Sequence, residues 1–259
     1  MTHTISPSLL VPRIGKSSFD CVATQFLSIF YPEALHTPMP VPIINILRKK
    51  MGLNLVYACL TEDFSVFGQI CFDTGYTMIY KKDIDEYKSV PVRGGTVIID
   101  PDTLKKRNLG CLNNTVAHEG VHWFLHRDYY HFLNQYVANA VACHCPADEN
   151  RKPQYTWTDE DRMEWQANNI APRILMPIQT VKTVYDMYGK EYDYSANRRD
   201  IALVDYEPAD DYKKRGINPR RIWVRDKVAE FFRVSKQSAA IRLEELGLVE
   251  KGCFSQYFK

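Results

Sequence analysis

Residues 118–122 read His-Glu-Gly-Val-His and open a strongly apolar run in the middle of the chain. Positions four apart lie one above the other on a helix, so His118 and His122 can offer two imidazole nitrogens to one zinc ion. Glu119 follows the first histidine, where its carboxylate can take a proton from a metal-bound water. The stretch predicts two metal ligands and a general base on one helix; the alternative is a chance match on a surface helix.

The bulk composition is that of an ordinary globular protein. The 259 residues carry a formal net charge of +2, which is too small to predict nucleic-acid or membrane binding by the whole molecule. No apolar run approaches the ~18 residues of a membrane-spanning helix, and residues 1–4 do not resemble the start of a signal peptide. The seven scattered cysteines suit a reducing compartment. Together these features predict a cytoplasmic protein.

The alternation of helical and extended patterns predicts an α+β fold. Apolar residues at helical spacing predict helices near residues 19–31, 41–51, 113–130, 159–175, 179–188, 220–232 and 235–246. Short runs rich in Val, Ile, Tyr and Phe predict a small, mostly antiparallel sheet packed on the helices, from residues 53–60, 68–72, 77–80 and 96–99. The last run directly precedes the metal helix, so it is a candidate for the edge of a cleft where an extended peptide adds as a strand.

A catalytic zinc site needs a third protein ligand and one open position for water. The metzincin pattern would require glycine and histidine where this chain has Leu125 and Asp128, so that class is excluded. A carboxylate from a later helix is the alternative, and Glu164 is favoured because small residues beside it permit close packing on the metal helix. Glu160 and Asp161 compete, but capping of the helix start explains both without a metal.

Three pieces of sequence occur in order along the chain. Residues 114–123 read Asn-Thr-Val-Ala-His-Glu-Gly-Val-His-Trp, residues 164–168 read Glu-Trp-Gln-Ala-Asn, and residues 174–177 read Ile-Leu-Met-Pro. This set resembles the ImmA/IrrE family of zinc metallo-endopeptidases, in which alanine precedes His-Glu-x-x-His and both Glu-x-x-Ala-Asn and Leu-Met-Pro follow. The resemblance covers at least residues 52–177, and residues 229–247 resemble the helix-turn-helix-like tail of many members.

The resemblance implies a fold and a kind of substrate. A zincin-like (gluzincin) peptidase core would occupy residues 1–190, and a linker with the helix-turn-helix-like helical tail would occupy residues 191–259, where residues 192–216 show little periodicity. Family members cleave a partner protein, often a transcriptional repressor of a mobile element or of a stress response. A zinc-dependent endopeptidase acting on a repressor is therefore the expected function, with no membrane partner.

The resemblance also implies the residues of the site. One zinc ion would be held by His118, His122 and Glu164, Glu119 would be the catalytic base, and Asn168 would be a hydrogen-bonding or helix-packing residue behind the ligands. The chain departs from the family at residues 120–121, where Gly-Val stands in place of the usual Leu-Gly. Gly-Val and Leu-Gly each contain a glycine, so either pair of residues is expected to put a small residue near the metal.

His126 continues the four-residue stride of the metal helix. It either hydrogen-bonds a metal ligand, as the residues behind zinc ligands do, or occupies an ordinary polar helix position, which is the commoner case. Residues 143–145, Cys-His-Cys, could suggest a second metal site. They lack a partner pair at a suitable spacing, so they predict a loop with free thiols instead.

The region from residue 213 to residue 236 is locally basic, with nine lysines and arginines against Asp226 and Glu230. DNA binding is one hypothesis, and the candidate groove readers on the second tail helix are Lys236, Gln237, Ser238 and Arg242. The favoured alternative is that the tail packs on the core or grips the substrate, because the acidic residues 244–245 would face phosphates poorly. The second functional hypothesis is thus a DNA-binding or scaffold regulator with a structural or vestigial metal site.

Overall fold

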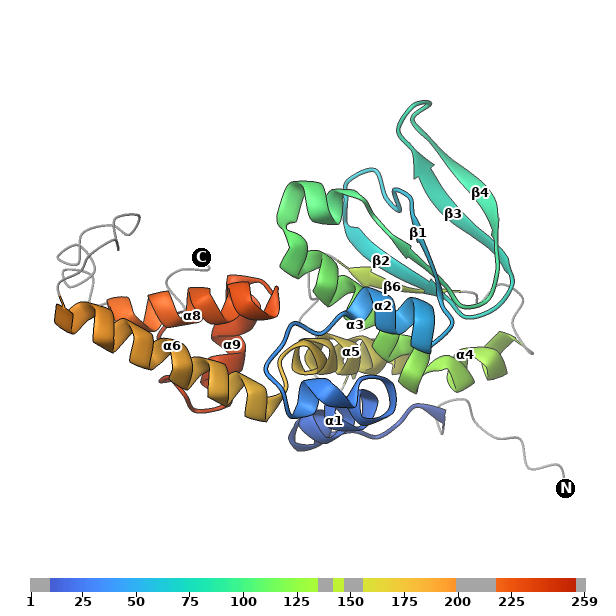
Figure 1. Cartoon of the computed structure of the whole chain (residues 1–259). Coiled ribbons are helices and arrows are strands. Elements are labelled where there is room, and N and C mark those ends of the chain that lie inside the picture. Colours follow the sequence, from blue (N-terminus) through green and yellow to red (C-terminus); the bar gives the residue numbers. More distant parts are fainter. Residues whose placement is uncertain (1–9, 135–141, 147–155, 199–217, 255–259) are drawn as a thin grey trace, which may run out of the picture.

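The structure, a computed structural model, describes residues 10–134, 142–146, 156–198 and 218–254. A four-stranded sheet has helices on one face and a long hairpin beyond its other face, and a group of three helices extends from one end of the molecule (Figure 1). The expected mixture of helices with a small sheet is confirmed. Among the described residues, no helix is long and apolar enough to cross a membrane.

The main sheet has the strand order β1-β5-β2-β6, with bounds Asn54–Tyr57, Thr96–Ile99, Val66–Cys71 and Ala142–Pro146. Strand β2 runs antiparallel to both of its neighbours, β5 and β6, whereas β1 runs parallel to β5. The hairpin consists of β3 (Gly75–Lys81) and β4 (Glu86–Val92). The prediction missed β4 because most of this strand is exposed and polar, so it lacks the apolar alternation of a half-buried strand.

Two predictions about strands are wrong. Residues 96–99 form β5, an internal strand with all four residues buried, so this segment cannot be the edge of a cleft. The outer strands of the described sheet are β1 and β6. Residues 143–145 lie within β6, paired with β2, and do not form the expected loop. Both errors concern pairing over long chain separations, which local patterns do not encode.

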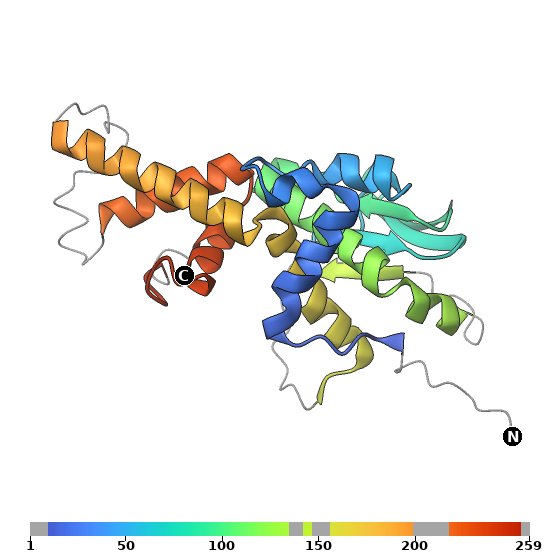
Figure 2. The ribbon, with the colours of Figure 1, turned by 60° about the horizontal axis from the view of Figure 1, so that its bottom comes forward.

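The helices that support the sheet lie beside it and share one hydrophobic core (Figure 2). Their bounds are Phe19–Phe30 for α1, Leu109–Leu125 for α3, Arg127–Asn134 for α4 and Asp159–Leu175 for α5. Shorter helical segments are η2 (Lys16–Ser18), η3 (Pro32–Leu35), α2 (Ile43–Asn45), η4 (Ile46–Lys50) and η5 (Thr103–Arg107). Helices α3 and α5 pack closely because Ala117 and Ala167 are fully buried at 0% exposure.

Helix α3 begins earlier than the sequence predicts. Asn108 is extended, and its side-chain oxygen accepts a hydrogen bond from the Cys111 amide at 2.9 Å, which satisfies a free donor at the helix start. Asn113, where the sequence predicts the helix to start, lies inside α3 and donates from its side chain to the Arg233 carbonyl at 2.9 Å. The helix ends at Leu125, and α4 follows in place of a continuous helix to residue 130.

The C-terminal helices are α6 (Ile178–Arg198), α8 (Pro219–Phe232) and α9 (Lys236–Glu245). Helix α6 passes through Gly189, where it was expected to end. A Cβ atom at this position would lie 2.6 Å from the guanidinium of Arg220, so the glycine permits close approach of α8. The predicted pair of tail helices is present, joined by a turn in which Arg233 has a left-handed backbone (φ 54°).

The tail helices are packed on the rest of the chain. Arg242 of α9 is only 2% exposed, and its guanidinium donates to the Met176 carbonyl at 3.1 Å and forms an ion pair with Asp20 of α1. At the other end of the tail, a Cβ atom on Gly110 would lie 2.3 Å from the Ser235 nitrogen. The turn between α8 and α9 therefore abuts the start of the helix that carries the histidines.

Candidate metal centre

The two histidines of the opening motif face each other on α3. The Nε2 atoms of His118 and His122 are 2.8 Å apart, and both side chains are fully buried. Residues four apart on a helix share a face, which accounts for their proximity. Burial against α5 is what the tertiary structure adds, because it directs both nitrogens at the same point of the neighbouring helix.

Glu164 of α5 completes the group. Its Oε2 lies 3.2 Å from His118 Nε2, and its Oε1 lies 3.1 Å from His122 Nε2. Atoms that bind one tetrahedral zinc ion are about 3.3 Å apart, so the spacing suits ligands of a single ion. The group could hold a metal ion. The Glu164 side chain is 20% exposed as a whole, although its Oε2 atom is buried, and both histidine side chains are fully buried.

The other acidic residues at the start of α5 do not join this group. Glu160 accepts a hydrogen bond from the Tyr129 hydroxyl at 3.1 Å. Asp161 forms a capping box with Thr158, in which each side chain bonds the backbone nitrogen of the other residue at 3.0–3.1 Å. The structure brings Glu164 to the histidines and leaves its two competitors at the helix start.

Glu119 is completely buried, and neither carboxylate oxygen has a hydrogen bond of ordinary geometry among the described residues; only the nearby Ile70 backbone favours its charged form. Burial raises its pKa well above the usual value, and the charge of Glu164 raises it further. An unpaired buried carboxylate is costly, so the arrangement requires a proton, a cation or water beside it. A metal ion at the neighbouring group would favour the ionised form.

The carboxylate of Glu119 lies against strand β2 at a glycine. A Cβ atom on Gly68 would be 2.8 Å from Glu119 Oε1 and 2.6 Å from Thr115 Cγ2. A side chain at position 68 would therefore push α3 away from the sheet or displace the carboxylate. The glycine lets the strand pass directly over the metal helix.

His126 lies behind His122. The Nδ1 atoms of these two rings are 3.0 Å apart, His126 Nε2 lies 2.9 Å from Gln166 Oε1, and the Gln166 amide donates to the Pro12 carbonyl at 2.6 Å. If His122 binds a metal through Nε2, its Nδ1 carries the proton. These three hydrogen bonds then run in one direction. His122 donates to His126, His126 donates to Gln166, and Gln166 donates to the Pro12 carbonyl.

Electrostatics supports neutral imidazoles beside an ionised carboxylate. Burial lowers the pKa of His122 and lowers the pKa of His126 to about 3. Burial raises the pKa of Glu164, but His122 and His118 outweigh it through their charges and hydrogen bonds, so the pKa is lowered overall. Metal ligands must be deprotonated, and these shifts favour the neutral form of His122 and the ionised form of Glu164.

Several features differ from the sequence-based expectations. His126 is fully buried, so it does not occupy an ordinary exposed helix position. Asn168 follows Glu164 by one turn and is half-buried, with no hydrogen bond to the three candidate ligands among those described. Gln166 supports the site through its contact with His126, and its place two residues after Glu164 was the only signal; the helix-packing role of Asn168 stays a prediction. Gly120 does not lie at the metal group: a Cβ atom there would be 2.9 Å from Leu47 Cδ1.

Comparisons with known proteins add no assignment. No family model matches the chain, and no curated protein matches its sequence. The interpretation of the site therefore rests on the positions and chemistry of its own residues.

Proposed function

We propose that this chain is a zinc-dependent endopeptidase with a zincin-like core, which hydrolyses peptide bonds of a protein substrate. The observation that carries the proposal is the convergence of His118, His122 and Glu164 within 2.8–3.2 Å of one another, with buried Glu119 beside them. The ImmA/IrrE-like order of the motifs supports the same reading and suggests a repressor as the substrate.

The donor set supports zinc. Two imidazole nitrogens with one carboxylate are a common ligand set of catalytic zinc sites, in which a fourth position stays open. His118, His122 and Glu164 would hold the ion, and the partly exposed side of Glu164 is where a substrate could enter. Bound zinc would polarise a peptide carbonyl and lower the pKa of water to about 7.

The other residues supply proton transfer and orientation. Glu119 would accept a proton as the water oxygen bonds to the peptide carbonyl carbon, and would deliver that proton to the amide nitrogen as the carbon–nitrogen bond breaks. Burial raises the pKa of Glu119, which helps it hold the proton between the two transfers, and a bound cation would favour the ionised form that accepts the proton. His126 would hold the ring of His122 in one orientation through the contact between their Nδ1 atoms.

The charges of the tail support a docking role more than DNA binding. Intramolecular carboxylates pair with several of its cations, in the pairs Arg220–Asp193, Arg221–Glu250, Lys227–Glu230 and Lys236–Asp226. Arg242, one of the four candidate groove readers, is buried against α1. A helix-turn-helix-like tail that packs on the core fits these contacts, and a salt-dependent shift of a defined duplex by the full chain would favour the DNA-binding alternative.

The proposal is tested with the full chain loaded with one equivalent of zinc and mixed with denatured proteins. We expect cleavage products by mass spectrometry, and we expect Glu119→Gln to slow cleavage by about 10²–10⁴-fold, as loss of a general base does. The variant should retain its zinc, because Glu119 is not a ligand.

Glu62→Gln is the control, since Glu62 is an exposed carboxylate remote from the histidines. It should cleave as the unchanged chain does. The proposal fails if the zinc-loaded chain cleaves nothing, or if Glu119→Gln cleaves at the unchanged rate.

A further inference from the structure

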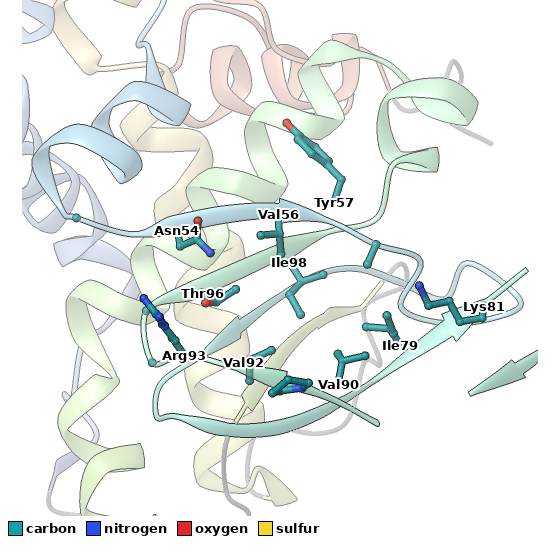
Figure 3. Close-up of a pocket in the computed structure, with 15 residues that line it drawn as sticks. Asn54, Val56, Tyr57, Ile79, Lys81, Val90, Val92, Arg93, Thr96 and Ile98 are labelled. Atoms are coloured by element: carbon teal, nitrogen blue, oxygen red, sulfur yellow. The ribbon is translucent and has the colours of Figure 1, made fainter. Parts of the chain in front are cut away.

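A groove lies on the face of the sheet opposite the metal centre. Gly68 of β2 faces α3, whereas the next residue, Gln69, donates to the Thr77 hydroxyl of the hairpin at 2.6 Å, which defines the two faces. The groove between the outer face and the hairpin has a volume of about 810 Å³. Figure 3 shows Val56, Ile98 and Ile79 along its middle, so the floor is apolar.

Two cations stand at opposite ends of this groove. Figure 3 shows Arg93 near Asn54 and Lys81 at the other end. Both are exposed, and neither has an ion-pair partner among the described residues, whereas nearby Lys82 pairs with Asp102 at 2.7 Å. No acidic residue lines the groove in the part of the chain that the structure describes. The groove is therefore complementary to an occupant with negative charge at both ends.

The strand that borders the groove has a free edge. The Asn54 amide donates to the carbonyl of Gly95, just before β5, at 2.9 Å, and the Ala58 amide donates to the carbonyl of Ile99 at the end of β5 at 3.2 Å. Successive backbone groups of a strand point to alternate sides, so the amides of Leu55 and Tyr57 point away from β5. In the described sheet no strand lies beyond β1, so these groups can pair with an added strand.

The backbone sets the spacing of the two cations. Arg93 immediately precedes the 94–95 glycines, and the Gly95 carbonyl bonds to Asn54 at the start of β1. Lys81 follows Tyr80, whose amide donates to the Cys59 carbonyl just beyond the end of β1. The landmarks Asn54 and Cys59 are five residues, or about 16–17 Å, apart. Carboxylates four residues apart span about 13 Å on one face of an added strand, and the long side chains of Arg93 and Lys81 can cover the difference.

We propose that this groove binds an extended acidic peptide segment of a partner protein, with carboxylates at positions i and i+4 and an apolar side chain at i+2. The segment adds to β1 as a strand, its apolar side chain lies beside Val56 on the outer face, and its carboxylates meet Arg93 and Lys81. This docking site is separate from the metal centre and does not require that the chain be a peptidase.

The test uses full-length Glu119→Gln protein, so that cleavage of the probe cannot disguise binding. The probe is a fluorescein-labelled heptapeptide with glutamates at its second and sixth positions, valine at the fourth and serine elsewhere. Its isomer has glutamates at the second and fifth positions, which places them on opposite faces of a strand at equal charge. By fluorescence anisotropy, we expect the first peptide to bind at least about tenfold more tightly than the isomer.

Four substitutions locate the binding. Lys81→Glu and Arg93→Glu should each weaken binding at least about tenfold, because a carboxylate then meets like charge. Lys182→Glu makes the same charge change at an exposed lysine of α6 and should alter affinity less than about twofold. Tyr57→Pro removes an outward N–H without removing a β1–β5 hydrogen bond and should weaken binding about fivefold, with circular dichroism as the check on folding.

The proposal is overturned if neither peptide binds, if the isomer binds equally, or if Lys182→Glu weakens binding as much as the groove substitutions do. It is also overturned if free glutarate displaces the probe at the peptide's own affinity, which would indicate a small-anion site. Tighter binding of a labelled single-stranded oligonucleotide through Lys81 and Arg93 would equally contradict it.

Discussion

The two sides of the four-stranded sheet border charged and titratable groups in opposite states. On the inner face, His118, Glu119 and His122 are completely excluded from water and lie against α5 and β2. On the outer face, Lys81 and Arg93 are exposed and have no ion-pair partner among the described residues. Burial shifts the pKa values of the site residues and holds their side chains in one arrangement, which catalysis requires. Exposed cations without an ion-pair partner remain available to bind a partner molecule.

The largest effect should follow removal of the third candidate ligand. Glu164→Gln is expected to weaken zinc binding at least about a hundredfold, since a zinc affinity of about 10–16 kcal/mol is shared among about four ligands. Competition with a chromophoric chelator measures this. Glu160→Gln, one turn earlier on α5 and bonded to Tyr129, is the matched control and should keep its zinc. Equal retention by both variants would show that the inner face has no such metal site.

The close contact between β2 and α3 should be nearly as sensitive. Gly68→Ala is expected to cost about 2–3 kcal/mol in the free energy of unfolding, because the added Cβ lies 2.6 Å from Thr115 Cγ2. Urea denaturation measures it, and Thr115→Ser in the same chain should recover part of the loss. Gly15→Ala, where a Cβ meets nothing within 4 Å, should change stability by less than about 0.5 kcal/mol. Equal costs at both glycines would contradict tight packing on the inner face.

The buried His126 should make the metal-free protein acid-sensitive. Its pKa is lowered by burial from 6.5 to about 3, so the unfolded chain takes up a proton below pH 6.5 that the folded chain does not. Stability is therefore lost as pH falls from 6.5 toward 3. Between pH 7 and pH 5 the unchanged protein should lose about 2 kcal/mol more than His126→Gln, measured by urea midpoints. An identical pH dependence would show that His126 is not held neutral.

The smallest effect is expected on the outer face. Lys81→Ala and Arg93→Ala should each change the free energy of unfolding by less than about 0.5 kcal/mol, because neither side chain has a described ion-pair partner to lose. Thermal melting of each variant measures this. A loss of several kcal/mol would mean that these cations stabilise the fold, and the contrast between the two faces would disappear.

Local sequence was sufficient for much of the metal helix and its chemistry. The four-residue spacing of His118 and His122 places both imidazoles on one face of any helix, whatever surrounds it. The start of α5 could also be predicted from local sequence, because a capping box depends only on two residues three positions apart. Thr158 and Asp161 form this capping box. Glu164 could be singled out by its context, but sequence alone could not place it 3.1 Å from His122.

Features that depend on distant segments were missed or wrong. The parallel pairing of β1 with β5 joins residues about forty positions apart, and β6 comes from a further segment of the chain. The hydrogen bonds that link His126 to Gln166 and Gln166 to Pro12 join three segments far apart in the sequence. No local pattern marks a glutamine as the residue between the other two. The burial of Arg242 against Asp20 agrees with the favoured hypothesis that the tail packs on the core, but no local pattern identifies Asp20 as the partner of Arg242.

The sequence by itself determined which residues could do chemistry together, because helical periodicity and donor type are properties of a few neighbouring positions. Only the tertiary structure decided which groups lose water. It buried Glu119 against Gly68, left Lys81 and Arg93 exposed, and brought Glu164 to the histidines. The physical reason is that desolvation and convergence arise from contacts between segments far apart in the chain, and those contacts set both pKa and accessibility.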